Sequence, residues 1–178
     1  MKKTEVINAI IIRADKHKEF DLRLVIFGDQ GLRTVYAIGA LRPNAKLKGA
    51  LQLFNLCELT ITGVRVTGAV VLQNGADISR DINRYYLACS ICETLHRLSR
   101  YSDEHTTPDV FALASASLGL LATGEISYSE VFIHFYHNLL LALGYDVEEG
   151  RVNATSIKNA YIIQLDFQIP FASNLSKA

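Results

Sequence analysis

The chain has 178 residues, 49% of them hydrophobic and 20% charged, which excludes a mainly disordered protein. No apolar run approaches the ~18 residues that a membrane-spanning helix needs. The formal net charge of zero combines a basic first half, with eleven Lys and Arg against six Asp and Glu in residues 1–76, and an acidic second half. The basic half favours an anionic partner.

The chain opens on a methionine and two lysines and passes directly into an alternating pattern, without the apolar stretch of a secretory signal. Its three cysteines, Cys57, Cys89 and Cys92, are too few for a secreted disulfide scaffold. Both observations predict a cytoplasmic protein.

Residues 1–76 alternate with a period of two, which is typical of β-strands. The pattern predicts strands at 6–13, 21–27, 32–38, 53–62 and 65–73, a charged loop at 14–20, a glycine turn at 28–31 and a basic loop at 39–49. In the strand at 32–38, Tyr36 is predicted to share the core face with Leu32. Five short antiparallel strands predict a closed or nearly closed barrel.

From residue 77 the period changes to about 3.6, which predicts helices. The first is capped by Asp77 or Ser79 and runs to about residue 100, and its two apolar sides predict a central position, packed between neighbours. The second spans 107–123, and the third begins at Ser127 or Ser129 and ends before Gly144. The fold class is therefore α+β, with all strands before all helices.

Residues 161–170 alternate strictly between apolar and mainly polar side chains, which predicts an amphipathic strand far from the others. A lone strand is unstable, so this one must pair with another. It either returns to the barrel or pairs across an oligomer interface, and the sequence leaves both alternatives open.

Three stretches of the first half, and one of the second, resemble the RecO family of bacterial recombination mediators. The first-half stretches are Phe27-Gly28-Asp29-Gln30-Gly31, Val35-Tyr36-Ala37-Ile38-Gly39-Ala40-Leu41-Arg42-Pro43 and Lys46-Leu47-Lys48-Gly49-Ala50-Leu51-Gln52-Leu53-Phe54. In that family a glycine turn precedes a strand ending in glycine, and a basic loop and an apolar run ending in Gln-x-Phe follow. The segment 139–145, ending Leu-Gly-Tyr, resembles the family's helical domain, so the resemblance spans 6–146.

The resemblance implies an OB-fold at residues 1–76 that binds single- and double-stranded DNA, a helical domain at 77–146 that contacts proteins, and a C-terminal segment at 147–178. The implied partners are RecR and the C-terminal tail of single-strand-binding protein. The implied role is strand annealing and assistance in loading RecA, without nucleotide hydrolysis. Many family members carry a four-cysteine zinc site after the Leu-Gly-Tyr region. This chain has no cysteine beyond Cys92 and resembles a short form without zinc.

The cations of the predicted barrel are the candidate nucleic-acid contacts, because clustered Lys and Arg release counterions from phosphates. They are Arg13, Lys16, Lys18, Arg23, Arg33, Arg42, Lys46 and Lys48. Arg23 and Arg33 are predicted to lie on the polar face of paired strands. Phe20, Tyr36 and Phe54 are the nearby aromatic candidates for base stacking. Because Tyr36 is placed on the core face, the electrostatic contribution is predicted to dominate.

Two groups of metal-compatible side chains have a simpler explanation as ordinary helix residues. Cys89, Cys92 and His96 share one face, but residues seven apart on a helix are ~10.5 Å apart, too far for bonds of ~2.0–2.3 Å to one ion. The glutamate and two histidines within 130–137 lack matching ligands on another helix. No nucleophile elbow or phosphate-binding glycine loop occurs. We therefore predict neither an enzyme nor a metal or cofactor.

Arg97 and Arg100 are the candidate partner-binding residues, as a positive rim for an acidic tail beside an apolar groove between the helices. The simpler explanation of the apolar residues in that groove is a plain core. The predicted function is a RecO-like mediator of DNA repair and recombination. The alternative is a protein–protein adaptor with an OB fold and little or no DNA binding.

Overall fold

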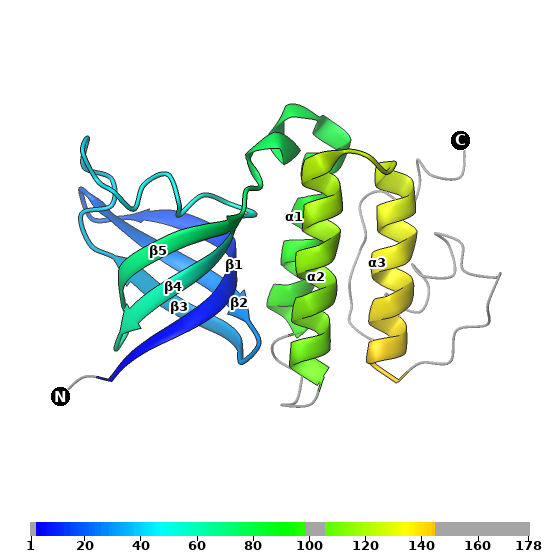
Figure 1. Ribbon diagram of the computed structural model, residues 1–178, viewed down its shortest axis with the longest axis horizontal. Helices are drawn as coiled ribbons and strands as arrows, with labels where there is room; N and C mark the ends of the chain where they lie inside the picture. Colours follow the sequence, from blue (N-terminus) through cyan, green and yellow to red (C-terminus); the bar gives the residue numbers. More distant parts are fainter. Residues whose placement is uncertain (1–2, 99–105, 145–178) are drawn as a thin grey trace.

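The computed structural model describes residues 3–98 and 106–144, which form five β-strands followed by helices (Figure 1). The strands are β1 (Thr4–His17), β2 (Asp21–Gly28), β3 (Gly31–Ala37), β4 (Leu56–Thr62) and β5 (Arg65–Gln73). The helices are a 3-10 turn η1 (Ala76–Arg80), α1 (Ile82–Leu98), α2 (Thr106–Thr123) and α3 (Tyr128–Ala142). The predicted α+β class, strands first, is confirmed. The predicted strand at 161–170 lies outside the described residues.

The five strands close into a barrel in the order β1-β2-β3-β5-β4, with β4 pairing back onto β1. The neighbours are antiparallel except for β3 and β5, which run parallel and meet at a single pair, Tyr36 opposite Arg65. A small five-stranded barrel of this kind, closed by one short contact between β3 and β5, corresponds to the OB fold. The barrel expected from the strand pattern is confirmed.

The barrel interior is filled by alternate residues from every strand. Its fully buried members include Ile11, Leu24, Leu59 and Ile61, together with Leu51 from the loop between β3 and β4. These positions have period two, so the residues between them face the outside of the barrel. The outward positions of β1, β2 and β3 are used in two ways, for packing against helices and for a polar surface.

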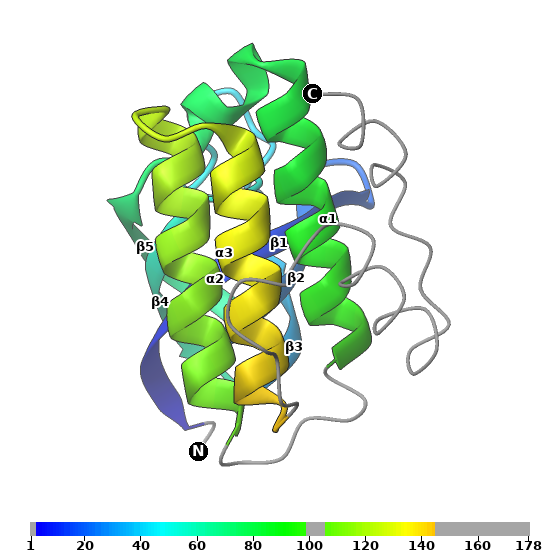
Figure 2. The same ribbon diagram turned by 90° about the vertical axis from the view of Figure 1, so that its right-hand side faces the viewer.

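A second core lies between the barrel and the helices. Ile10, Val25 and Phe27 project from the outer face of the barrel and join the apolar faces of all three α-helices in one continuous cluster. The three helices stand side by side, with the barrel behind them (Figure 2). The α1 helix contacts β1, α2 and α3, so it packs between several neighbours, as its two apolar sides predict. None of the helices described is long and apolar enough to cross a membrane.

Phe54 anchors this second core from the loop that precedes β4. Its ring is buried and meets the ring of Tyr85 on α1 edge to face at 5.7 Å. Its backbone has a φ of +67°, a region that side chains other than glycine occupy at some cost. Hydrogen bonds fix that conformation, because the Phe54 amide donates to the Ile11 carbonyl and the Ile11 amide donates to the Asn55 carbonyl. The barrel and the helices are therefore locked together at this residue.

Local side-chain interactions set the ends of the helices. Ser127 caps α3, accepting from the Glu130 amide while the Glu130 carboxylate accepts from Ser127, which confirms one of the two predicted caps. The cap predicted at 77–79 is wrong. Those residues form η1, and the Asp81 carboxylate caps α1 by accepting from the amides of Asn83 and Arg84.

Two strand boundaries also differ from the prediction. The segment 14–20 was expected to be a loop because it is charged, but β1 continues to His17 as a two-stranded ribbon with β2. Pairing between backbones, which is indifferent to charge on the outer face, extends the strand there. The strand expected from residue 53 begins at Leu56, because the left-handed Phe54 interrupts the extended chain.

Candidate nucleic-acid interface

Arg23 and Tyr36 lie opposite each other on the outer face of the β2–β3 hairpin. On β2, Leu22 and Leu24 point into the barrel, so Arg23 between them points outward and is exposed. Residues opposite each other on adjacent strands share a face, so Tyr36 is directed outward too, and it is half-buried. In OB folds this hairpin face is the one that receives oligonucleotides.

The prediction that Tyr36 lies on the core face is therefore wrong. The buried residues of β3 are Val35 and Ala37, and the face shared by Leu32 and Tyr36 is the outer one. Leu32 is apolar because the helices cover that end of the outer face, where it packs against the second core. Because the outward residue Leu32 is apolar, the alternation pattern assigned its whole face of the strand, Tyr36 included, to the core.

Arg65 joins the same surface from β5. It is opposite Tyr36 at the only pair between β3 and β5, and the Tyr36 amide donates to the Val64 carbonyl at 2.8 Å. The next residue, Val66, is buried inside the barrel, so the exposed Arg65 points outward. Tyr36 thus lies between two arginines from neighbouring strands. Sequence reasoning missed Arg65, because only the parallel contact between β3 and β5 brings it to this face.

Aromatic side chains from the turn between β1 and β2 extend the surface. The ring of His17 lies 5.2 Å from that of Tyr36, centroid to centroid. Phe20 is 38% exposed, and the guanidinium carbon of Arg42 stands 5.8 Å from its ring centroid, a cation–π distance. The loop after β3 is tied to this turn, since the Gly39 amide donates to the Asp21 carboxylate at 2.7 Å. We call His17, Phe20, Arg23, Tyr36 and Arg65, with Arg42 alongside, the ring face.

Arg33 does not belong to the ring face. It is opposite Ile26, which points into the barrel, so Arg33 lies on the inward side at the barrel's end. There it forms an ion pair of 2.6 Å with Glu5, and both side chains are about 30% exposed. The hydrogen bond from Arg33 lowers the pKa of the Glu5 carboxyl below its ordinary value. The prediction that Arg33 shares a polar face with Arg23 is wrong, because the strand register separates them.

The remaining predicted cations fall into two groups. Arg13 is paired with Asp15 at 2.8 Å, which neutralises much of its charge. The others are exposed and form no ion pair within residues 3–98 and 106–144: Lys16 and Lys18 near the β1–β2 turn, and Arg42, Lys46 and Lys48 in the loop after β3. The free cations therefore gather on the loops that border the ring face.

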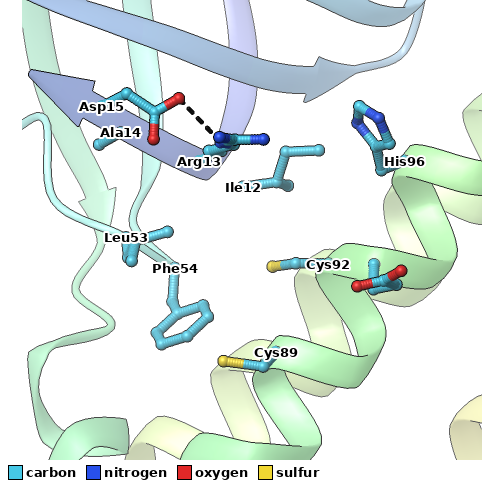
Figure 3. A pocket seen from close by; sticks show the side chains of 10 residues that line it. Ile12, Arg13, Ala14, Asp15, Leu53, Phe54, Cys89, Cys92 and His96 are labelled. Carbon is cyan, nitrogen blue, oxygen red and sulfur yellow. Dashed lines mark ion pairs between the residues drawn. The ribbon is translucent and has the colours of Figure 1, made fainter. Parts of the chain in front are cut away.

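A separate pocket of about 400 Å³ lies between β1 and α1 (Figure 3). Ile12, Leu53 and Phe54 form its apolar wall, Cys89 and Cys92 line it from α1, and the Arg13–Asp15 pair and His96 stand near its rim. Burial raises the pKa of the Cys89 and Cys92 thiols, so both stay protonated at neutral pH. Among the described residues, no three His, Cys, Asp or Glu side chains are grouped to hold a metal ion.

The helices offer little of the predicted partner site. Arg97 is hydrogen-bonded to Glu93 one turn earlier, with its nearer nitrogen at 2.8 Å, while Arg100 lies outside the described residues. Of the six apolar residues expected to line a groove, Leu118, Leu121, Phe132, Phe135 and Leu139 are buried, and Leu113 is partly buried against the same core. Tyr136 adds to that core, with its hydroxyl 2.7 Å from Ser90 on α1. No open groove follows from these residues.

Comparison with known proteins supports a single family. Residues 79–150 match the model for the C-terminal part of recombination protein O. A DNA repair protein RecO of Synechococcus elongatus is 30% identical over 69% of this chain and 47% of its own length. RecO proteins of Desulforamulus reducens and Desulforudis audaxviator are 26% and 28% identical over 76% and 80% of this chain, and 53% and 57% of their own lengths. The chain spans about half the length of the curated relatives it matches.

Proposed function

This chain is related to the RecO family of DNA repair proteins, and we propose that it binds nucleic acid on its ring face in DNA repair or recombination. One observation carries the proposal. On the outer face of the barrel, Tyr36 lies between Arg23 and Arg65 in the strand register, so an aromatic ring is flanked on both sides by cations. Rings for bases, with cations for phosphates beside them, are what a single-strand site needs.

In this proposal the arginines and the aromatic rings bind different parts of the nucleic acid. Arg23 and Arg65 contact phosphates, and the gain comes from the release of counterions that the backbone had condensed. The half-buried ring of Tyr36 and the exposed ring of Phe20 accept bases by stacking, which tolerates any sequence. The free cations of the two bordering loops lengthen the phosphate track. Because phosphate contacts do not depend on strand number, we propose that both single- and double-stranded DNA bind here.

The family relation supports a more specific role, which we propose as a mediator of recombination. In that role the protein anneals complementary strands and assists the loading of RecA, with RecR and the tail of single-strand-binding protein as partners. A surface that holds strands mainly through their phosphates suits annealing because the base edges stay available for pairing. This chemistry needs no bound cofactor.

The decisive experiment is fluorescence anisotropy of a labelled single-stranded oligonucleotide at two salt concentrations. We expect binding that weakens with salt, with ~0.7 in the logarithmic slope for each phosphate contact. The double variant Arg23→Ala/Arg65→Ala should lose both affinity and slope. The variant Lys46→Ala/Lys48→Ala tests the bordering loop separately. Arg80→Ala is the control, since Arg80 is exposed on η1 and paired with Asp77.

The adaptor remains a second candidate for one specific reason. Arg13 and Arg33, two of the predicted phosphate contacts, are occupied by acidic side chains of the barrel itself. An adaptor with an OB fold and little DNA binding would show no anisotropy change even at low salt, and its ring face would bind a protein instead. Salt-sensitive binding that the arginine variants abolish would exclude this alternative.

A further inference from the structure

The pocket between β1 and α1 adjoins the ring face along the outer side of β1. Asp15 lines the pocket, and it lies opposite Arg23 of the ring face in the strand register. Because opposite residues share a face, Asp15 points outward as Arg23 does. His17 of the ring face follows two residues later on the same side of β1, a distance of ~6.8 Å along a strand. The pocket therefore begins one outward side chain away from the ring face.

The interior of the pocket suits an uncharged ring. Ile12, Leu53 and Phe54 form an apolar wall, and the sulfur atoms of Cys89 and Cys92 point toward the barrel from α1 (Figure 3). Both thiols are uncharged at neutral pH, because burial raises the pKa of each. Polarizable sulfur makes favourable contacts with aromatic rings. The volume of about 400 Å³ lies within the ~300–1,000 Å³ range of pockets that bind small ligands.

The charges around the pocket favour a neutral occupant over an anion. Its charged lining residues are two carboxylates, Asp15 and Glu93, and one arginine, Arg13, which is paired with Asp15 at 2.8 Å. A phosphate or an acidic peptide would meet this excess of negative charge. A carboxylate accepts, and a guanidinium donates, more than one hydrogen bond, so the Arg13–Asp15 pair still offers both kinds of partner to the polar edge of a base.

We propose that this pocket receives one unpaired nucleobase of a single strand whose phosphates lie on the ring face. The inference rests on the proposed nucleic-acid binding and adds a preference to it. In a duplex each base is stacked and paired, and bringing one out costs free energy, whereas a single strand offers its bases directly. The pocket therefore favours single strands over duplexes, which phosphate contacts alone do not. The bases that stay outside the pocket remain available for pairing.

The first test fills the pocket with the variant Cys89→Phe. Fluorescence anisotropy compares a labelled single-stranded oligonucleotide with a duplex of the same sequence. Loss of one bound base should weaken single-strand binding by about 5- to 150-fold and leave duplex binding unchanged. Asn83→Phe, which adds a ring at an exposed position of the same helix, is the matched control and should bind both as the wild type does. Arg23→Ala/Arg65→Ala should weaken both, and circular dichroism reports that each variant is folded.

The second test uses the wild-type chain and does not depend on a variant that folds. Cys89 is half-buried at the pocket, so iodoacetamide should alkylate it at mildly alkaline pH, while Cys57, buried inside the barrel, is the internal reference. A saturating single strand should slow alkylation of Cys89 by at least about fivefold, because a base in the pocket blocks access to the thiol. A saturating duplex should leave the rate unchanged. Peptide mass spectrometry measures both cysteines.

The outcomes separate this inference from the proposed function. Single-strand affinity that is unchanged in folded Cys89→Phe, or that falls equally with duplex affinity, would overturn the pocket and leave binding on the ring face intact. Alkylation that a bound single strand does not slow would do the same. Protection of Cys89 by an acidic, apolar peptide but not by a single strand would assign the pocket to a protein partner instead. Absence of binding of either nucleic acid to the wild type would overturn the proposed function itself.

Discussion

The rings of His17 and Tyr36 lie 5.2 Å apart, centroid to centroid, although β2 runs between the strands that carry them. Their β2 neighbours are Asp21, opposite His17, and Arg23, opposite Tyr36. Both rings must therefore lean over the outer surface of β2 to meet. The contact makes a continuous aromatic surface across three strands, with Arg23 emerging beside it.

This contact predicts a measurable stacking contribution from Tyr36. Stacking of a base on an aromatic side chain is worth about 1–3 kcal/mol, so Tyr36→Ala should weaken binding of a single-stranded oligonucleotide by about 5- to 150-fold. Tyr36→Phe keeps the ring and should bind nearly as the wild type does. Anisotropy titration at moderate salt measures both. Equal affinity of the alanine and phenylalanine variants would show that the ring is not a platform.

Arg65 is expected to act on phosphates alone. Replacing it with alanine should lower affinity for all oligonucleotide sequences alike and reduce the logarithmic salt slope by ~0.7 for a single strand. Arg80→Ala, which removes an exposed arginine outside the barrel, should leave both quantities unchanged. The measurement is the dissociation constant at several salt concentrations. An affinity loss that depends on base sequence, with the slope intact, would contradict a phosphate contact.

The sequence is sufficient to predict local features of this fold, but it does not predict which surfaces Arg33 and Arg65 join. Alternation predicts the barrel strands because period two is a local property, and the capping box of α3 can be read directly from Ser127 and Glu130. Alternation shows that Arg33 and Leu32 lie on opposite faces of β3, but it does not show which face is inward, because Leu32 is an outward residue made apolar by the helices that cover it. Arg65 reaches Tyr36 only because β3 and β5 lie side by side, which strand periodicity alone does not encode.

The Glu5–Arg33 pair predicts a pH-dependent contribution to stability. The pKa of Glu5 is lowered in the folded protein, so the pair stabilises the fold above the ordinary value of 4.5, and the contribution is lost as pH falls through the lowered pKa. Glu5→Gln should therefore reduce the free energy of unfolding at pH 7. Urea unfolding at pH 7 and at about pH 3 measures the difference, which should shrink at the lower pH. A deficit that is the same at both values would mean that the charge of Glu5 is not responsible.

Gly75, at the junction of the barrel and the helices, allows no side chain. A Cβ atom there would lie 2.7 Å from the Cβ of Phe54 and 2.8 Å from its carbonyl carbon. The Gly75 backbone cannot easily shift away from Phe54, because the Gly75 amide donates to the buried side-chain oxygen of Asn55 at 2.8 Å. Relief would have to come from Phe54, which is itself held at a φ of +67° by its bonds to β1.

Gly75→Ala should consequently destabilise the protein by about 1–3 kcal/mol, the usual cost of forcing extra atoms into a packed site. Gly49→Ala is the matched control, since a Cβ at that exposed glycine meets nothing within 4 Å and should change the free energy of unfolding by less than about 0.5 kcal/mol. Urea unfolding followed by circular dichroism measures both variants. Because the clash lies where Phe54 joins the two parts, the Gly75 variant should also expose amides of α1 to faster hydrogen exchange. Equal stability of the two variants would mean that Phe54 is free to move, and that the barrel and the helices are not locked together at this residue.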